Sequence, residues 1–119
     1  MTFQEYFDGF KAKFDGVDVS DIKDHLAFQF NIDDPEAGGA FYVEVKEGQL
    51  YIEPYQYFDR DAAFTCTPET LDKIVTGKTD PIAAFTIQKL KVDGSIEKAL
   101  RLKDIVDQKS KKASGKKKK

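Results

Sequence analysis

The segment spanning residues 76–102 constrains the fold of this chain more than any other part of the sequence. Asp80-Pro81 is a helix start signal, because the aspartate can cap the first turn and proline in that turn needs no hydrogen-bond partner. A short alternating strand is predicted over residues 89–93, and Ser95 is expected to cap a last helix. The polar residues of this segment mark where helices and strands begin and end. Its apolar residues predict an apolar surface suited to an apolar ligand.

Four earlier segments alternate apolar and polar residues with a period of two, which is typical of strands with one buried face. They cover residues 26–32, 41–46, 50–53 and 63–66. Alternation on every strand favours an antiparallel or mixed sheet over a doubly wound parallel one. We therefore predict a two-layer α+β domain with a five-stranded, mostly antiparallel sheet. One face of the sheet is expected to be covered by four or five helices, and the other to be exposed to solvent.

Helical signals accompany the strands. One stripe of phenylalanines with helical spacing predicts an amphipathic helix at the N-terminus: Phe3, Phe7, Phe10 and Phe14. Thr67-Pro68 starts a further helix, and residues 20–23 are predicted to form a short one.

The charge is divided between two regions. Residues 109–119 hold seven lysines and no acid, whereas residues 1–108 hold 12 basic and 21 acidic side chains and carry −9. We expect one domain over residues 1–108 and a disordered tail over 109–119. The tail lysines are candidates for docking on an anionic membrane: Lys109, Lys111, Lys112, Lys116, Lys117, Lys118 and Lys119. A single cysteine and an N-terminus without an apolar signal core favour the cytoplasm.

Residues that carry chemistry are scarce. The lone His25 has no nucleophile beside it in sequence, and Cys66 falls on the inward face of a strand. The acids at 33, 34 and 36 do not fit a calcium loop. We expect no catalytic residue, no metal and no cofactor. Nucleic-acid binding is disfavoured because the strand tyrosines are interleaved with acids such as Glu44 and Glu53.

Two blocks of sequence resemble the sterol carrier protein-2 family. The first is the hairpin AFYVEVKEGQLYI, and the second is TLDKIVTGKTDPIAAFTIQKLKVDGSIEKALRL. The second contains, in the family's order, Gly77-Lys78, Pro81, Ala84-Phe85, Lys89-Leu90-Lys91-Val92, Gly94 and Ala99-Leu100-Arg101-Leu102. The resemblance extends from about residue 26 to 106. It departs where the family often has Gln-Gly before this Lys-Leu-Lys, since this chain has Ile87-Gln88.

The resemblance implies a five-stranded sheet under helices, with an apolar cavity or tunnel for lipids between the two layers. We accordingly predict a non-catalytic lipid-binding or lipid-transfer protein for a sterol, fatty acid, acyl-CoA or similar ligand, acting as a monomer or weak dimer. The expected lining residues are Phe28, Phe30, Phe41, Val43, Ile52, Phe64, Ile82, Phe85, Thr86, Ile87, Gln88, Leu90, Ile96 and Leu100. Each of these positions equally fits plain core packing. A protein-interaction or dimerisation module with a filled core, including an accessory role in lipid or quinone metabolism, is the alternative.

Overall fold

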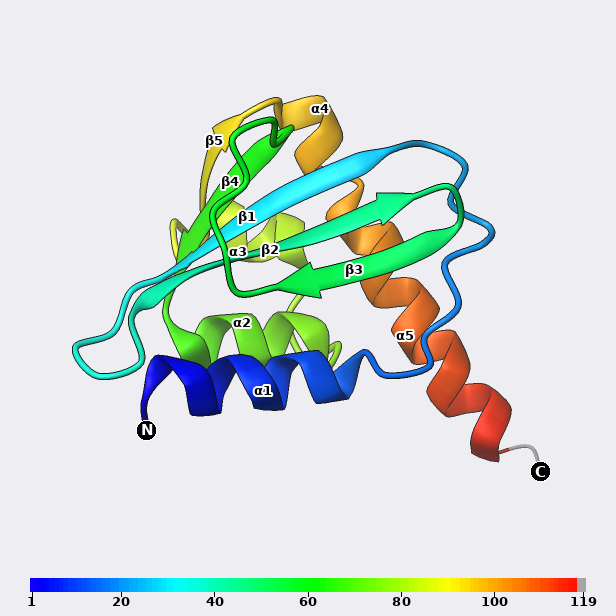
Figure 1. The fold of residues 1–119 in the computed structure, drawn as a ribbon, viewed down its shortest axis with the longest axis horizontal. Helices are drawn as coiled ribbons and strands as arrows, with labels where there is room; N and C mark the ends of the chain where they lie inside the picture. Colours follow the sequence, from blue (N-terminus) through cyan, green and yellow to red (C-terminus); the bar gives the residue numbers. More distant parts are fainter. Residues whose placement is uncertain (118–119) are drawn as a thin grey trace.

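A computed structural model describes the backbone of residues 1–117 and the side chains of residues 1–109. The elements follow the order α1 (Phe3–Lys13), β1 (Leu26–Ile32), β2 (Gly39–Lys46), β3 (Gln49–Glu53), β4 (Ala62–Cys66), α2 (Pro68–Val75), α3 (Pro81–Thr86), β5 (Lys91–Gly94), α4 (Ile96–Ala99) and α5 (Leu102–Lys117) (Figure 1).

The five strands form one sheet in the order β3-β2-β1-β4-β5. Strands β1 and β4 pair in parallel, and the other three neighbouring pairs are antiparallel. The prediction of a mixed, mostly antiparallel sheet is therefore confirmed. The parallel pair arises because the chain leaves β3 at one edge, crosses the sheet and enters β4 beyond β1 (Figure 1).

A row of phenylalanine rings crosses the middle of the sheet on its inner face. Phe30 is paired with Phe41 on one side and with Phe64 on the other. The ring centroids of these two pairs lie 5.3 and 5.2 Å apart, so both pairs are stacked. All three side chains are at most 1% exposed. Offset aromatic pairs of this kind add to the gain from burying apolar area.

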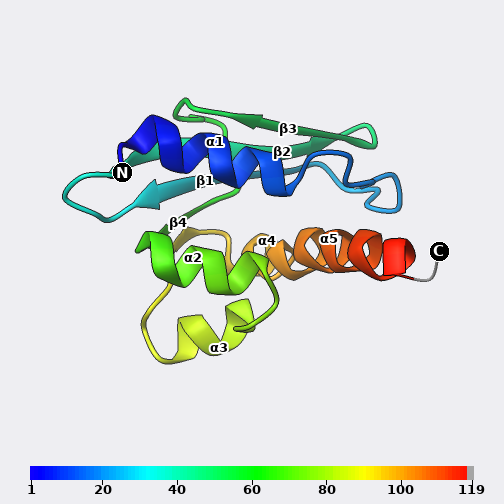
Figure 2. The same cartoon turned by 90° about the horizontal axis from the view of Figure 1, so that it is seen from below.

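The helices cover this inner face, and Figure 2 shows α2, α3 and α5 together on one side of the sheet. Helix α1 begins with a complete capping box, in which Thr2 and Glu5 satisfy each other's backbone N–H groups. Phe7, Phe10 and Phe14 of the predicted stripe are buried and Phe3 is half-buried, and the ring of Phe10 lies 4.7 Å from that of Phe41. These phenylalanines thus pack α1 against the sheet.

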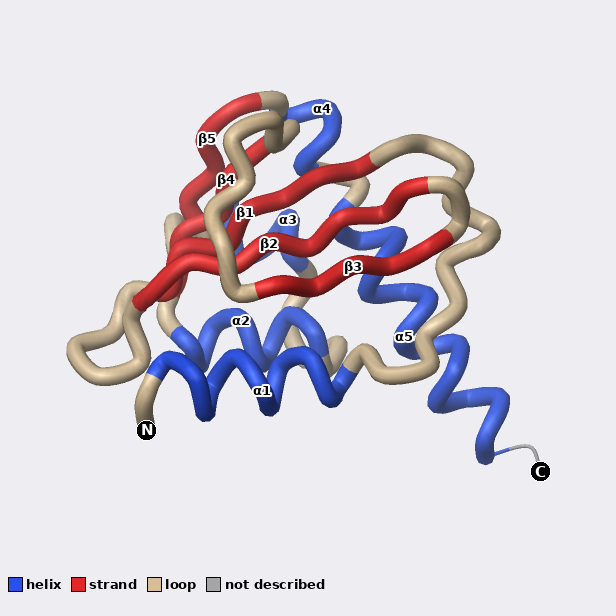
Figure 3. Tube along the Cα trace, in the orientation of Figure 1, coloured by secondary structure: helices blue, strands red, loops and turns tan. Residues whose placement is uncertain are grey.

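The outer face is less exposed than the alternation predicts, because the loop of residues 54–61 crosses it (Figure 3). The Tyr57 backbone N–H donates to Gln29 Oε1 at 3.0 Å, and the Tyr57 hydroxyl donates to Glu44 Oε2 at 2.8 Å. Gln29 and Glu44 are consequently buried although they occupy the polar phase of their strands. The outer face is therefore covered in this part of the sheet instead of being exposed to solvent.

Two helix predictions also differ from the structure. Residues 20–23 contain a turn instead of a helix, although the neighbouring Val19 and Ile22 are buried in the core. The last predicted helix is divided into α4 and α5, which meet at Leu100 and Arg101. Helix α5 continues to Lys117, into the segment 109–119 for which disorder is expected. The side chains after Lys109, and residues 118–119 entirely, lie outside the described residues, and the disorder of the tail stays a prediction.

Candidate functional site

An apolar groove opens at the β5 side of the sheet, between helices α3 and α4. Its volume is about 270 Å³. The lining consists of Phe64, Pro81, Ile82, Phe85, Thr86, Leu90, Val92, Ile96, Ala99 and Leu100. None of these ten side chains is charged.

Helix α3 forms one wall. It starts where the Asp80 side chain accepts a hydrogen bond from the Ile82 backbone N–H at 2.9 Å, as its start signal predicts. Residues 82, 85 and 86 of this helix then fall on one side, because side chains three and four positions apart share a helix face. Ala84, on the other side, is buried against the core. The short helix therefore points Ile82 and Phe85 into the groove.

Helix α4 forms the opposite wall by the same logic. The Ser95 hydroxyl caps it by accepting from the Lys98 backbone N–H at 3.1 Å. Ile96, Ala99 and Leu100 follow at helical spacing and face the groove. The floor comes from the sheet, where Phe64 of β4 is paired with Val92 of β5.

The groove exposes apolar surface that the fold leaves uncovered. Ile82, Phe85, Ile96 and Leu100 are 45, 44, 48 and 51% exposed. The groove's single side-chain hydroxyl, on Thr86, donates to the Ile82 carbonyl within α3 at 2.9 Å. An uncharged groove with half-exposed aliphatic and aromatic walls has no group for acid–base or nucleophilic chemistry. It suits the binding of an apolar molecule.

The structure brings seven of the predicted lining residues into this groove: Phe64, Ile82, Phe85, Thr86, Leu90, Ile96 and Leu100. It also adds three residues that the prediction omitted, namely Pro81, Val92 and Ala99. The apolar spacing of α4 could have revealed Ala99, and strand alternation could have revealed Val92. Pro81 carried only the signal of a helix start.

The other seven predicted residues lie elsewhere. Phe28, Phe30, Phe41 and Val43 are buried in the closely packed core. Ile52 borders a different hollow, between α1 and β3. Ile87, the C-terminal cap of α3, is 62% exposed and is not part of the groove lining. Gln88 lies in a polar depression beside Lys89 and Lys91.

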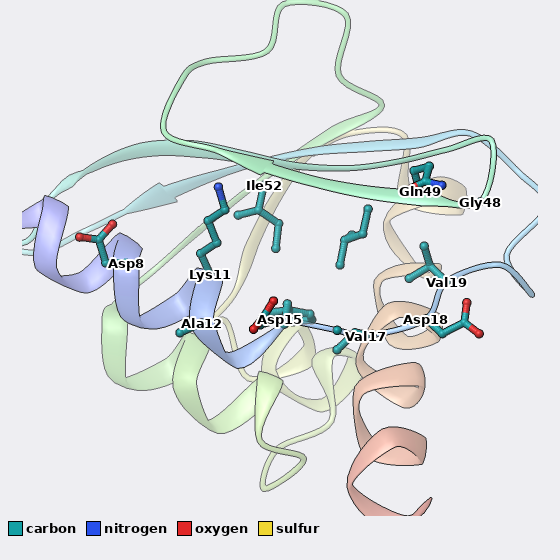
Figure 4. A pocket seen from close by; sticks show the side chains of 13 residues that line it. Asp8, Lys11, Ala12, Asp15, Val17, Asp18, Val19, Gly48, Gln49 and Ile52 are labelled. Atoms are coloured by element: carbon teal, nitrogen blue, oxygen red, sulfur yellow. The ribbon is translucent and has the colours of Figure 1, made fainter.

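A larger hollow of about 630 Å³ lies between the C-terminal half of α1, residues 14–19 and strand β3 (Figure 4). Its lining mixes apolar residues with Asp8, Asp15, Asp18 and Lys11. Charged groups at this density would have to be desolvated by an apolar ligand, at a cost that the smaller groove avoids. Size alone therefore does not make this hollow the better lipid site.

The remaining candidates for chemistry have structural roles. His25 Nε2 lies 2.6 Å from Glu44 Oε2. Burial of Glu44 opposes its ionisation, but hydrogen bonds from His25 and Tyr57 hold the pKa of the carboxyl below its ordinary value. Burial raises the pKa of the Cys66 thiol to about 12, so the reactive thiolate is suppressed. No group of three or more acid, histidine or cysteine ligands that could hold a metal occurs among the described residues.

Comparisons with known proteins agree with an apolar binding groove. A family model described as the SCP-2 sterol transfer family matches residues 13–107. No significant match occurs among curated proteins. Within the described part of the chain, no helix is long and apolar enough to cross a membrane.

Solved structures share the fold at low identity. A palmitate complex of sterol carrier protein-2 from Aedes aegypti is 17% identical, with 91% of this chain and 96% of that chain covered and a TM-score of 0.62. A UbiJ-SCP2 ubiquinone synthesis protein is 12% identical, with coverages of 89 and 96% and a TM-score of 0.67.

The sec-alkylsulfatase Pisa1 from Pseudomonas sp. is 20% identical, with 70% of this chain covered and a TM-score of 0.60. This chain covers only 12% of the sulfatase, so the likeness concerns one part of that enzyme. At these identities the structural likenesses show the fold alone. The family match covers most of the sequence, and on that basis this chain belongs to the SCP-2 sterol transfer family.

Proposed function

We propose that this protein binds the hydrocarbon chain of a single-chain lipid, such as a fatty acid or fatty acyl ester, in the groove between α3 and α4, without catalysing a reaction. The proposal rests on the uncharged lining of the groove and on its four half-exposed apolar side chains, which are Ile82, Phe85, Ile96 and Leu100. Each methylene moved from water into such a lining contributes about 0.8 kcal/mol.

The volume of the groove favours a flexible chain over a rigid ring system. About 270 Å³ is slightly below the range of about 300–1,000 Å³ that is common for ligand sites. A hydrocarbon chain can enter a small groove in part and gain free energy with each methylene, whereas a sterol nucleus needs the whole volume at once. The palmitate complex of the Aedes aegypti neighbour supports a fatty acyl ligand.

A second candidate function is an interaction or dimerisation module, including an accessory role like that implied by the name of the UbiJ-SCP2 neighbour. It is favoured by three large exposed side chains away from the groove, Tyr51, Tyr55 and Phe58. A mass that rises with protein concentration, in protein without extractable lipid, would support this candidate over lipid binding.

Paired phenylalanine variants test the lipid proposal. Phe85 is 44% exposed in the groove wall, whereas Phe58 is 87% exposed in the loop over the outer face. We expect Phe85→Asp to weaken the binding of a fluorescent acyl probe by at least tenfold, because a carboxylate would have to be desolvated in the groove. Phe58→Asp introduces the same charge and should leave binding unchanged.

The test needs two further measurements to be decisive. Circular dichroism establishes that both variants are folded, and mass spectrometry of lipid extracted from the wild-type protein identifies any natural ligand. Equal probe affinity for Phe85→Asp and Phe58→Asp would exclude the groove as the binding site. Absence of both extractable lipid and probe binding would favour the interaction module.

The cellular setting of the proposal is the cytoplasm, where such a protein would carry or present an acyl chain. The lysines of residues 109–119 supply a further attraction to anionic membranes. Each lysine close to the surface of an anionic membrane contributes about 1 kcal/mol to the free energy of membrane binding.

A further inference from the structure

Strand β5 forms an open edge of the sheet. It is joined to β4 by an antiparallel ladder on one side, and α4 follows it directly along the chain (Figure 1). Lys91, Asp93 and Gly94 are exposed, and Val92 is half-buried. The last strand of a sheet presents a row of backbone N–H and C=O groups that can pair with another chain. The question is therefore which chain fits this edge.

The hydrogen bonds of the ladder decide which backbone groups of β5 point away from the sheet. The Ser95 N–H donates to the Asp61 carbonyl at 2.9 Å, in line with the β4–β5 ladder. In an antiparallel pair every second residue bonds toward the neighbouring strand. Counting back from Ser95, the N–H and C=O groups of Val92 and Gly94 therefore point outward. Among the described residues, no backbone group outside the ladder bonds to either of them.

The side chains of β5 alternate between the two faces of the sheet. Val92 lines the apolar groove on the helix side, so Lys91 and Asp93 lie on the opposite face. Neither of these two charged side chains forms an ion pair with a described residue. The edge thus presents a cation and an anion two residues apart, with an apolar side chain between them in sequence.

The order Lys91-Val92-Asp93 is complementary to itself when two copies run antiparallel. With Val92 of each copy opposite the other, Lys91 of one copy lies opposite Asp93 of the second copy, and the reverse pair forms by symmetry. Opposite charges directly across a sheet stabilise the pairing, whereas like charges weaken it. In the same register the outward N–H and C=O groups of the two Val92 residues meet in a hydrogen-bonded pair.

The helices on either side of β5 support this register. Because the two strands run in opposite directions, the start of α4 in one copy approaches the end of α3 in the other. Ile96 and Ile87, at these two places, are 48 and 62% exposed, and their burial would favour association. Residues 86–97 contain two basic and two acidic side chains, so the facing segments carry no net charge that would make them repel each other.

The other edge of the sheet, β3, is less suited to pairing. Lys11 of α1 lies beside it, with Nζ 3.8 Å from Glu53 Oε2. Ile52 is 5% exposed, so its backbone is covered together with its side chain. A strand added at β3 would have to displace this cover, whereas three of the four residues of β5 are exposed.

We propose that two copies of this chain associate through their β5 strands, in the antiparallel register that places Lys91 opposite Asp93. The interface is isologous, because the same strand is used by both copies, and the two five-stranded sheets continue into each other. Since Val92 also belongs to the groove lining, the β5 strand of each copy borders the groove of the other. The inference goes beyond acyl binding, and each can hold without the other.

Charge reversal on β5 tests both the interface and its register. Sedimentation equilibrium of the full-length protein should give a mass that rises from 13.5 kDa toward twice that value as the protein concentration increases. Lys91→Asp and Asp93→Lys each place like charges opposite one another, so each variant alone should dimerise at least tenfold more weakly. An equimolar mixture of the two variants restores opposite charges at both positions and should associate like the wild type. Lys46→Asp and Glu47→Lys make the same charge changes in the exposed β2–β3 turn and should dimerise normally.

Circular dichroism establishes that all variants are folded, and amide hydrogen exchange gives a second readout. Exchange of the Val92 N–H should slow as the concentration of the wild-type protein rises. A wild-type protein that stays at 13.5 kDa at millimolar concentration would overturn the inference. Equal dimerisation by Lys91→Asp and Lys46→Asp would also overturn it, because another surface would then hold the copies together. A mixture of Lys91→Asp and Asp93→Lys that remains monomeric would refute the proposed register.

Discussion

Replacing Phe64 by alanine should weaken the fold and enlarge the lipid site at the same time. Phe64 is 1% exposed, forms part of the floor of the groove, and lies 5.3 Å from Phe28 and 5.2 Å from Phe30 between ring centroids. Truncation of a buried phenylalanine to alanine costs about 3–5 kcal/mol of unfolding free energy. The void left behind would open into the groove, where an acyl chain can reach it.

A bound acyl chain should therefore recover part of the lost stability. Each methylene that enters the void contributes about 0.8 kcal/mol, which is about a fourfold gain in affinity. A ligand present at 100 times its dissociation constant stabilises the folded state by about 2.7 kcal/mol. We expect palmitate to raise the unfolding free energy of Phe64→Ala by more than it raises that of the wild-type protein.

The matched control is Phe10→Ala. Phe10 is 2% exposed and packs on Phe14 and Phe41, but it does not line the groove. Its truncation should cost a similar free energy without enlarging the lipid site. The assay is denaturant unfolding of both variants and the wild type, with and without palmitate. The reasoning fails if palmitate stabilises Phe64→Ala no more than Phe10→Ala.

Two further predictions concern the polar network and the tail. The hydrogen bond from Tyr57 to Glu44, together with burial, raises the pKa of Tyr57 to about 12. This hydrogen bond therefore stabilises the folded state fully below the ordinary tyrosine pKa of about 10, and its contribution to the unfolding free energy is lost as pH rises through about 12. Unfolding free energies measured across this pH range should show that Tyr57→Phe loses this pH dependence, whereas the exposed Tyr55→Phe keeps it. Deleting residues 109–119 should lower binding to anionic vesicles at low salt, because seven lysines contribute about 1 kcal/mol each before screening by salt. If the truncated protein binds these vesicles as well as the intact chain does, the tail has no role in membrane binding.

The sequence predicts the sheet well because alternation reports directly which side chains share a face. Phe28 and Phe30 of β1 and Phe41 and Val43 of β2 all face the helices, as their spacing indicates. Alternation does not report what covers the other face. The burial of Gln29 depends on Tyr57, which is 28 residues away in sequence and reaches it through the crossing loop.

The site is harder to predict than the fold for a related reason. Hydrophobicity marks a side chain as inward-facing but does not tell whether neighbouring side chains fill the space in front of it. Phe30 and Phe64 follow the same pattern, yet Phe30 is packed within the core while Phe64 also borders the groove. The difference arises because α3 and α4 are short and leave a gap over β4 and β5. Helix α3 ends at Thr86, which places Ile87 on the surface outside the groove lining.

The most direct test of the central claim is to locate a bound acyl chain by NMR. Nuclear Overhauser effects would be measured between ¹³C-labelled palmitate and the side chains of the protein. We expect contacts to Phe64, Leu90 and Leu100 in the groove between α3 and α4. Contacts confined to Ile52 and Val17, in the larger hollow below β3, would contradict it.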